Sequence, residues 1–341
     1  MTFRVALARL RMWGEAIRRH RLLPFGLALL LPLLAALSVS RGAVEVPWRD
    51  LPAALVQSGH PLHRVVFDVR LARVVAGFLV GASLAAAGVL TQTMVRNPLA
   101  DPSLLGVSGG AGAAAVAALI FAPEATLLLP FFAFGGALAV VGITLALAFA
   151  GGPGGSPLRL ILSGVALQAL SFSAIALLTF FFADRAPAFV AFTVGSLAAA
   201  GWREAGFVAV GAALAGLLAA LALRPLNLLA LDDDSAAGVG LAVRRARFGA
   251  AALAALFASS AVAAGGLIGF VGLVVPNWVR RSTGPDLRFW LPTSAVVGAL
   301  LVGVADLLAR TVAAPIELPV GALLAAVGAP YFLFLIWRRT P

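Results

Sequence analysis

The residues of this 341-residue chain that could do chemistry are few, and most lie at the edges of long apolar segments. Asp306 is the main acidic residue inside such a segment, where a carboxylate is costly unless it is paired or relays ions. Arg310 follows four residues later, on the same face of a helix, which predicts a structural ion pair. The three histidines lie outside the apolar segments. Their scarcity argues against a path for a bare soft metal ion.

Composition excludes several other kinds of chemistry. All 25 basic residues are arginine, and a P-loop needs a lysine that reaches the nucleotide phosphates. Cysteine is absent, which rules out disulfides and thiolate sites. The formal charge of +11 is scattered between apolar segments, unlike the single basic face of a nucleic-acid-binding protein. We therefore expect no catalytic site, no resident metal or cofactor and no nucleic-acid partner.

The apolar segments predict an all-α integral membrane protein, because 62% of the residues are hydrophobic and a bilayer core takes about 20 helical residues to cross. The longest segment, 248–279, is divided at Gly265-Gly266, which predicts a tight turn between two helices. The result is ten transmembrane helices. They are expected in the uncharged segments 22–40, 74–95, 103–122, 126–149, 160–183, 205–223, 248–279 (two helices), 289–305 and 318–337.

Arginine placement sets the expected topology. With both termini in the cytoplasm, 17 arginines fall on the cytoplasmic side and eight outside, as the positive-inside rule requires. Residues 1–21 then form a basic cytoplasmic N-terminus and residues 22–341 a single transmembrane domain. Within it, 186–202 is an outer helix and loop, and 224–247 is a cytoplasmic loop. The alternative at the N-terminus is a cleaved signal, with cleavage after residues 37 to 40.

Several motifs carry a resemblance to a known family. They are Arg70-Leu-Ala-Arg73, Arg96-Asn-Pro-Leu-Ala-Asp-Pro-Ser-Leu-Leu-Gly-Val-Ser-Gly-Gly110, Gly269-Phe-Val-Gly-Leu-Val-Val-Pro276, Ala305-Asp-Leu-Leu-Ala-Arg310, Glu317-Leu-Pro-Val-Gly321 and Gly328-Ala-Pro330. In this order, from about residue 64 onward, they closely resemble the FecCD-type permeases, the membrane subunits of type II ABC importers for iron-siderophores, haem and cobalamin. The resemblance implies the type II ABC importer permease fold.

The resemblance also implies partners and sites. The partners are a second copy of the chain, two cytoplasmic ABC ATPases that use the ATP, and a periplasmic binding protein, all at a bacterial inner membrane. Arginines matching Arg70, Arg73 and Arg310 are expected to receive acidic groups of the binding protein as rim charges. The helix that couples to the ATPases is expected in 226–240, with Leu229, Leu231, Asp232, Asp233, Asp234, Ser235 and Gly240. The translocation path is expected to include Gly164, Leu167, Gln168, Ser171 and Phe172.

The predicted function is therefore import of a metal chelate, powered by separate ATPase subunits. Haem is favoured as the chelate, because the segment Phe192-Thr-Val-Gly-Ser-Leu197 and the following Trp202 are similar to haem permeases. A ferric siderophore and cobalamin are the alternatives within the family. Two other classes remain: an ion-coupled secondary carrier, which would work without ATPases, and a receptor or scaffold that transports nothing.

Overall fold

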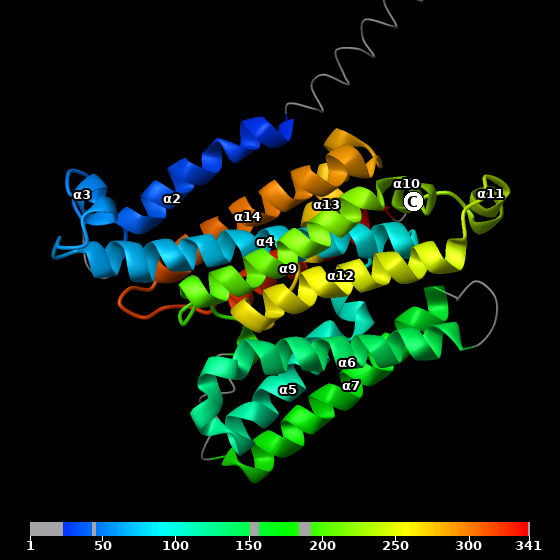
Figure 1. Cartoon of the computed structure of the whole chain (residues 1–341), viewed down its shortest axis with the longest axis horizontal. Helices are drawn as coiled ribbons and strands as arrows, with labels where there is room; N and C mark the ends of the chain where they lie inside the picture. Colours follow the sequence, from blue (N-terminus) through cyan, green and yellow to red (C-terminus); the bar gives the residue numbers. More distant parts are fainter. Residues whose placement is uncertain (1–22, 43–45, 151–156, 184–191, 340–341) are drawn as a thin grey trace, which may run out of the picture.

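The computed structural model describes residues 23–42, 46–150, 157–183 and 192–339, and the regular structure in these ranges is helical throughout. Helices satisfy their own backbone hydrogen bonds, which a segment in lipid requires. Figure 1 shows the long helices running side by side. They are α2 (Leu30–Ser40), α4 (Ala72–Val95), α5 (Val107–Phe121), α6 (Leu129–Phe149), α7 (Pro157–Phe181), α9 (Trp202–Leu221), α12 (Val243–Gly265), α13 (Val271–Thr283), α14 (Leu287–Thr311) and α15 (Val320–Arg339).

Each of the ten predicted membrane segments overlaps one of these helices. Seven described helical stretches are long and apolar enough to cross a membrane, while α5 and the apolar part of α15, Val320–Leu333, are shorter. α13 has 13 residues. The all-α membrane fold is confirmed, whereas the count of ten crossings stays a prediction.

The predicted division of segment 248–279 is confirmed. α12 ends at Gly265, and Gly266 has a φ of +69°, a backbone region that favours glycine. The outer segment 186–202 is only partly described, and its residues 192–201 contain no helix long enough to span a membrane. The basic N-terminus, 1–21, lies outside the described residues.

α4 is the central helix of the bundle. In its most apolar window 78% of the residues are buried, against 22% in the first stretch, Leu23–Ser40. It packs on α9, α12, α13 and α14 (Figure 1). A Cβ added at Gly81 would overlap the carbonyl oxygen of Gly298 on α14, and one at Gly88 would overlap that of Gly272 on α13. Small residues thus let α4 approach its neighbours closely.

We expect Gly88→Ala to destabilise the protein by about 1–3 kcal/mol, because the added methyl group has no room. Gly135→Ala is the matched control: Gly135 is on an exposed face of α6 with nothing within 4 Å of an added Cβ. There the better helix propensity of alanine should leave stability unchanged or raise it by up to about 1 kcal/mol. Melting temperatures in detergent measure both. Equal effects of the two substitutions would refute the packing argument.

Two short elements differ from the sequence-based expectation at the start and the end of α4. A π-helix, η1 (Arg64–Leu71), runs directly into α4, so Arg70 and Arg73 lie on a continuous helical stretch and not before it. After α4 the chain turns back into η2 (Pro102–Leu105), where Pro102 contacts Gly272 and lies near Leu84. Leu84 lies about three helical turns before the end of α4, so the chain re-enters the bundle at η2.

The two ends of the bundle carry different short helices. α3 (Leu51–Val56) lies at one end, called here the α3 end, and α10 (Leu223–Leu228) and α11 (Asp233–Gly238) lie at the other, the α11 end (Figure 1). The segment 226–240, in which the coupling helix was predicted, holds the end of α10 and all of α11, separated by a turn at 229–232. α12 begins at Val243, within the predicted loop 224–247.

Candidate functional site

The α3 end holds an arginine cluster, defined as Arg70, Arg73 and Arg310 with the carboxylates of Asp306 and Glu317. Arg73 on α4 donates from Nε to Oδ1 of Asp306 at 2.9 Å and from Nη1 to Oε2 of Glu317 at 2.8 Å. Arg310 Nε lies 3.1 Å from Asp306 Oδ2, close enough for an ion pair but without hydrogen-bond alignment. The predicted pair of Asp306 and Arg310 is confirmed, and Arg73 is a further partner.

The cluster also holds the end of α2. Arg70 Nη1 donates to the carbonyl of Val39 at 2.8 Å, and Arg310 Nη2 donates to that of Ser38 at 3.2 Å. Carbonyls in the last helical turn lack intrahelical partners and carry partial negative charge, so cations stabilise them. These contacts give the arginines a structural reason to lie at this end.

The cluster is more buried than rim charges would be. Arg70, Arg73 and Arg310 are 6%, 6% and 7% exposed, and Asp306 is 2% exposed. Only the Glu317 side chain, at 46%, is well exposed. Arg310 also lines a surface cavity of about 520 Å³ together with Arg41 and Trp48. An external acidic group would therefore reach the arginines through this cavity or at Glu317.

At the α11 end, the predicted coupling residues divide into surface and anchoring groups. Asp232 is the N-cap of α11, and its Oδ2 accepts the Ser235 backbone N–H at 2.9 Å. This hydrogen bond holds the pKa of Asp232 below its usual value. Leu229 is buried, whereas five of the predicted residues are exposed: Leu231, Asp232, Asp234, Ser235 and Gly240.

Asp233 anchors α11 to two long helices. Its carboxylate lies 2.9 Å from Arg96 Nη2, just after α4, and 2.8 Å from Arg247 Nη2, in the second turn of α12. Arg96 also donates to the carbonyl of Leu231 at 2.8 Å, and Arg247 is only 2% exposed. The aspartate that was predicted to contact a partner therefore ties the short helix to the membrane domain.

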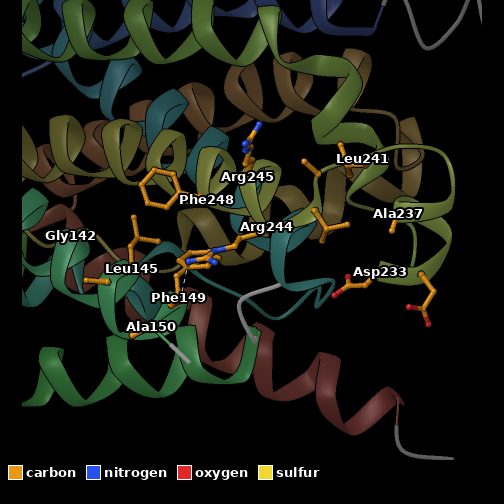
Figure 2. Close-up of a pocket in the computed structure, with 14 residues that line it drawn as sticks. Gly142, Leu145, Phe149, Ala150, Asp233, Ala237, Leu241, Arg244, Arg245 and Phe248 are labelled. Carbon is orange, nitrogen blue, oxygen red and sulfur yellow. Dashed lines mark hydrogen bonds between the residues drawn. The ribbon is translucent and has the colours of Figure 1, made fainter. Parts of the chain in front are cut away.

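A cavity of about 1400 Å³ lies beside α11, between it, the second half of α6 and the start of α12. Figure 2 shows Arg244 lying over Phe149 on one side of this cavity, with Asp233 on the side of α11. Arg244 donates to the Phe149 carbonyl at 3.1 Å, and its guanidinium carbon lies 5.7 Å from the ring centroid. The cavity combines an apolar wall with charges of both signs, which suits a partner with mixed chemistry.

A second cavity, of about 480 Å³, called here the inner cavity, lies among η2, α7 and the start of α13 and is open to the outside on one side. Two of the predicted path residues, Gln168 and Phe172, line it. Gly164 instead packs against the carbonyl of Leu104 on η2, and the Ser171 hydroxyl donates to the carbonyl of Leu167 at 2.8 Å. The structure thus brings two of the five together at one cavity.

Phe270 is a cavity residue that sequence reasoning missed. It has a φ of +67°, rare for a bulky residue, and it lies at the turn that starts α13. A Cβ at Gly328 on α15 would come within 2.7 Å of its ring, so the ring packs directly on α15. The sequence Gly269-Phe270 alone does not distinguish this conformation from that of an ordinary loop.

These features define a multi-pass helical membrane protein with charged clusters at both ends. The FecCD transport family profile matches residues 29–338, and the chain belongs to that family. It is 42% identical over 308 residues to the Fe(3+) dicitrate transport system permease protein FecD of Escherichia coli (strain K12), covering 89% of this chain and 94% of the relative. It is 38% identical to the hemin transport system permease protein HmuU of Yersinia pestis, covering 92% and 94%.

A solved structure agrees with this membership. A metal-chelate type ABC transporter in an inward-facing conformation superposes with a TM-score of 0.79 at 32% sequence identity, covering 92% of this chain and 98% of that one. The chain therefore has the fold of an ABC transporter permease, as its motifs predicted.

Proposed function

We propose that this chain is the membrane subunit of an ABC importer that carries a metal chelate into the cytoplasm of a bacterium across its inner membrane. Its relatives include permeases for ferric dicitrate and hemin, and a solved structure of a metal-chelate type ABC transporter shares its fold. A chain with no lysine lacks the P-loop, so separate ATPases supply the energy.

The observation that carries the proposal is the anchoring of α11. α11 is an exposed short helix, and the ion pairs of Asp233 connect it to both α4 and α12. A partner that displaces α11 would therefore move those helices. α4 packs in turn on α13 and α14, next to the inner cavity. We place the ATPases at α10 and α11, and hence the α11 end in the cytoplasm.

At the other end we place the periplasmic binding protein. The arginine cluster contains three cations and two carboxylates, and Arg310 opens onto a cavity that Arg41 also lines. The arginines that line this cavity suit acidic groups of a docking partner, which orient the partner more than they add affinity. In a homodimer, Gln168 and Phe172 from each copy would contribute to the path near the shared axis.

Haem, ferric citrate and related chelates remain candidate cargoes. The segment that favoured haem is largely used in packing: Phe192 accepts the backbone N–H of Leu267, and Gly195 accepts that of Gly321. The ring of Trp202 packs against that of Phe67 at a tilt of 41°, with ring centroids 5.1 Å apart. Only Thr193 of the 192–197 segment lines the inner cavity, so this segment gives little reason to prefer haem.

The test is reconstitution into liposomes. With the ATPase, the binding protein and ATP, we expect accumulation of chelate against its gradient; without the ATPase we expect none. Accumulation driven by an ion gradient alone would establish a secondary carrier instead. Failure to transport any of the chelates with all three components present would favour the receptor or scaffold.

A further inference from the structure

The guanidinium of Arg73 holds two carboxylates of very different exposure. Asp306 is almost completely buried and shared with Arg310, while the Glu317 side chain is 46% exposed. Glu317 lies on the loop between α14 and α15, outside regular structure. Its 2.8 Å contact with Arg73 is therefore an ion pair that faces outward.

The exposure of the Glu317 side chain makes this contact exchangeable. A half-exposed ion pair contributes little stability, because water screens it and the side chain must be held in one rotamer. A carboxylate from outside can make the same contact with Arg73 at a similar free energy.

We propose that Glu317 is a displaceable internal ligand of Arg73, which leaves when a carboxylate of the docking binding protein takes its place. The inference rests on the proposed function and names how the docking site is regulated. Arg73 stays neutralised while the permease is alone, and its N–H groups are presented to a partner only in exchange for Glu317.

Displacement of Glu317 also affects α15 and the inner cavity. Glu317 precedes the first residue of α15 by three positions, and Gly321 donates its N–H to the carbonyl of Gly195 at 3.0 Å. Gly328, two turns further along α15, packs on Phe270 at the inner cavity. Release of Glu317 thus removes a tether from the loop that enters the helix beside this cavity.

The experiment compares binding-protein affinity for Glu317→Gln and for wild-type permease in the ATPase complex in nanodiscs. Glu317→Gln removes the competitor, so we expect affinity to rise about two- to fivefold, the range of one exposed ion pair. Asp68→Asn is the control for long-range charge, because Asp68 is exposed on η1 and makes no ion pair among the described residues. Asp68→Asn should change the affinity for the binding protein clearly less than Glu317→Gln does.

Each outcome is decisive. A gain for Glu317→Gln that exceeds the gain for Asp68→Asn supports exchange, and the gain should disappear when Arg73→Gln is added. Equal gains, or no gain for Glu317→Gln, would overturn it. Wild-type complex that fails to bind the binding protein at all would instead count against the proposed function.

Discussion

Asp306→Asn should lower the free energy of unfolding by about 3–5 kcal/mol, because it leaves two buried guanidinium groups without their shared carboxylate. Arg73 and Arg310 both contact Asp306, and all three side chains are at most 8% exposed. The loss should appear as a large drop in the melting temperature of the purified permease in detergent, with early dissociation of α2 from the bundle.

Two comparisons make this result specific. Glu317→Gln removes a carboxylate from the same cluster, but from its exposed side, and should cost at most about 1 kcal/mol. Combining Asp306→Asn with Arg310→Met should recover part of the loss, since one uncompensated charge is then removed. A similar cost for Asp306→Asn and Glu317→Gln would show that burial does not decide the strength of these ion pairs.

Ala237→Pro should abolish chelate uptake in liposomes that contain the permease, its ATPase and the binding protein, while ATP hydrolysis continues. Proline removes the hydrogen bond from residue 237 to Asp233 in α11 and costs about 3 kcal/mol in a helix interior. α11 has six residues, so it is not expected to survive this change. The ATPase would then cycle without moving α4 and α12.

Ala237→Ser is the control for this substitution. Ala237 is exposed, and serine keeps the backbone N–H, so uptake per ATP should stay close to wild type. Uptake and phosphate release are measured on the same vesicles. Normal uptake by Ala237→Pro would contradict the assignment of α11 as the coupling helix.

The helical segments could be predicted from the sequence because each is an uncharged run of nearly bilayer length. The turn at Gly265-Gly266 was also predictable, since paired glycines within an overlong apolar run favour a break. The π-helix before α4 and the re-entrant η2 were not, because tertiary contacts stabilise both. Pro102, for example, depends on Gly272, which lies 170 positions further along the chain.

For the charged sites too, contacts within one helix were predictable and contacts between distant segments were not. The Asp306 and Arg310 pair follows from spacing along one helix, whereas Arg73 reaches Asp306 across 233 positions. Spacing along the chain therefore did not predict that the arginines are buried. It also gave no sign that Glu317, in the motif Glu317-Leu-Pro-Val-Gly321, contacts Arg73. Asp232 is the N-cap of α11, a position that suits the side chain of an aspartate. Asp233 looked equivalent by sequence, but it pairs with Arg247 on α12.

The position of α4 has a consequence for how the protein responds to its membrane. Protein covers most of α4, while the stretches Leu23–Ser40 and Trp202–Leu221 have only 22% of their apolar windows buried. A change in lipid chain length therefore acts on those peripheral helices, which can adjust by tilting, and scarcely on the central one. Thinner or thicker bilayers should change the tilt of these outer helices. α4, with the ion pairs of Arg73 and Arg96 at its two ends, should stay undisturbed.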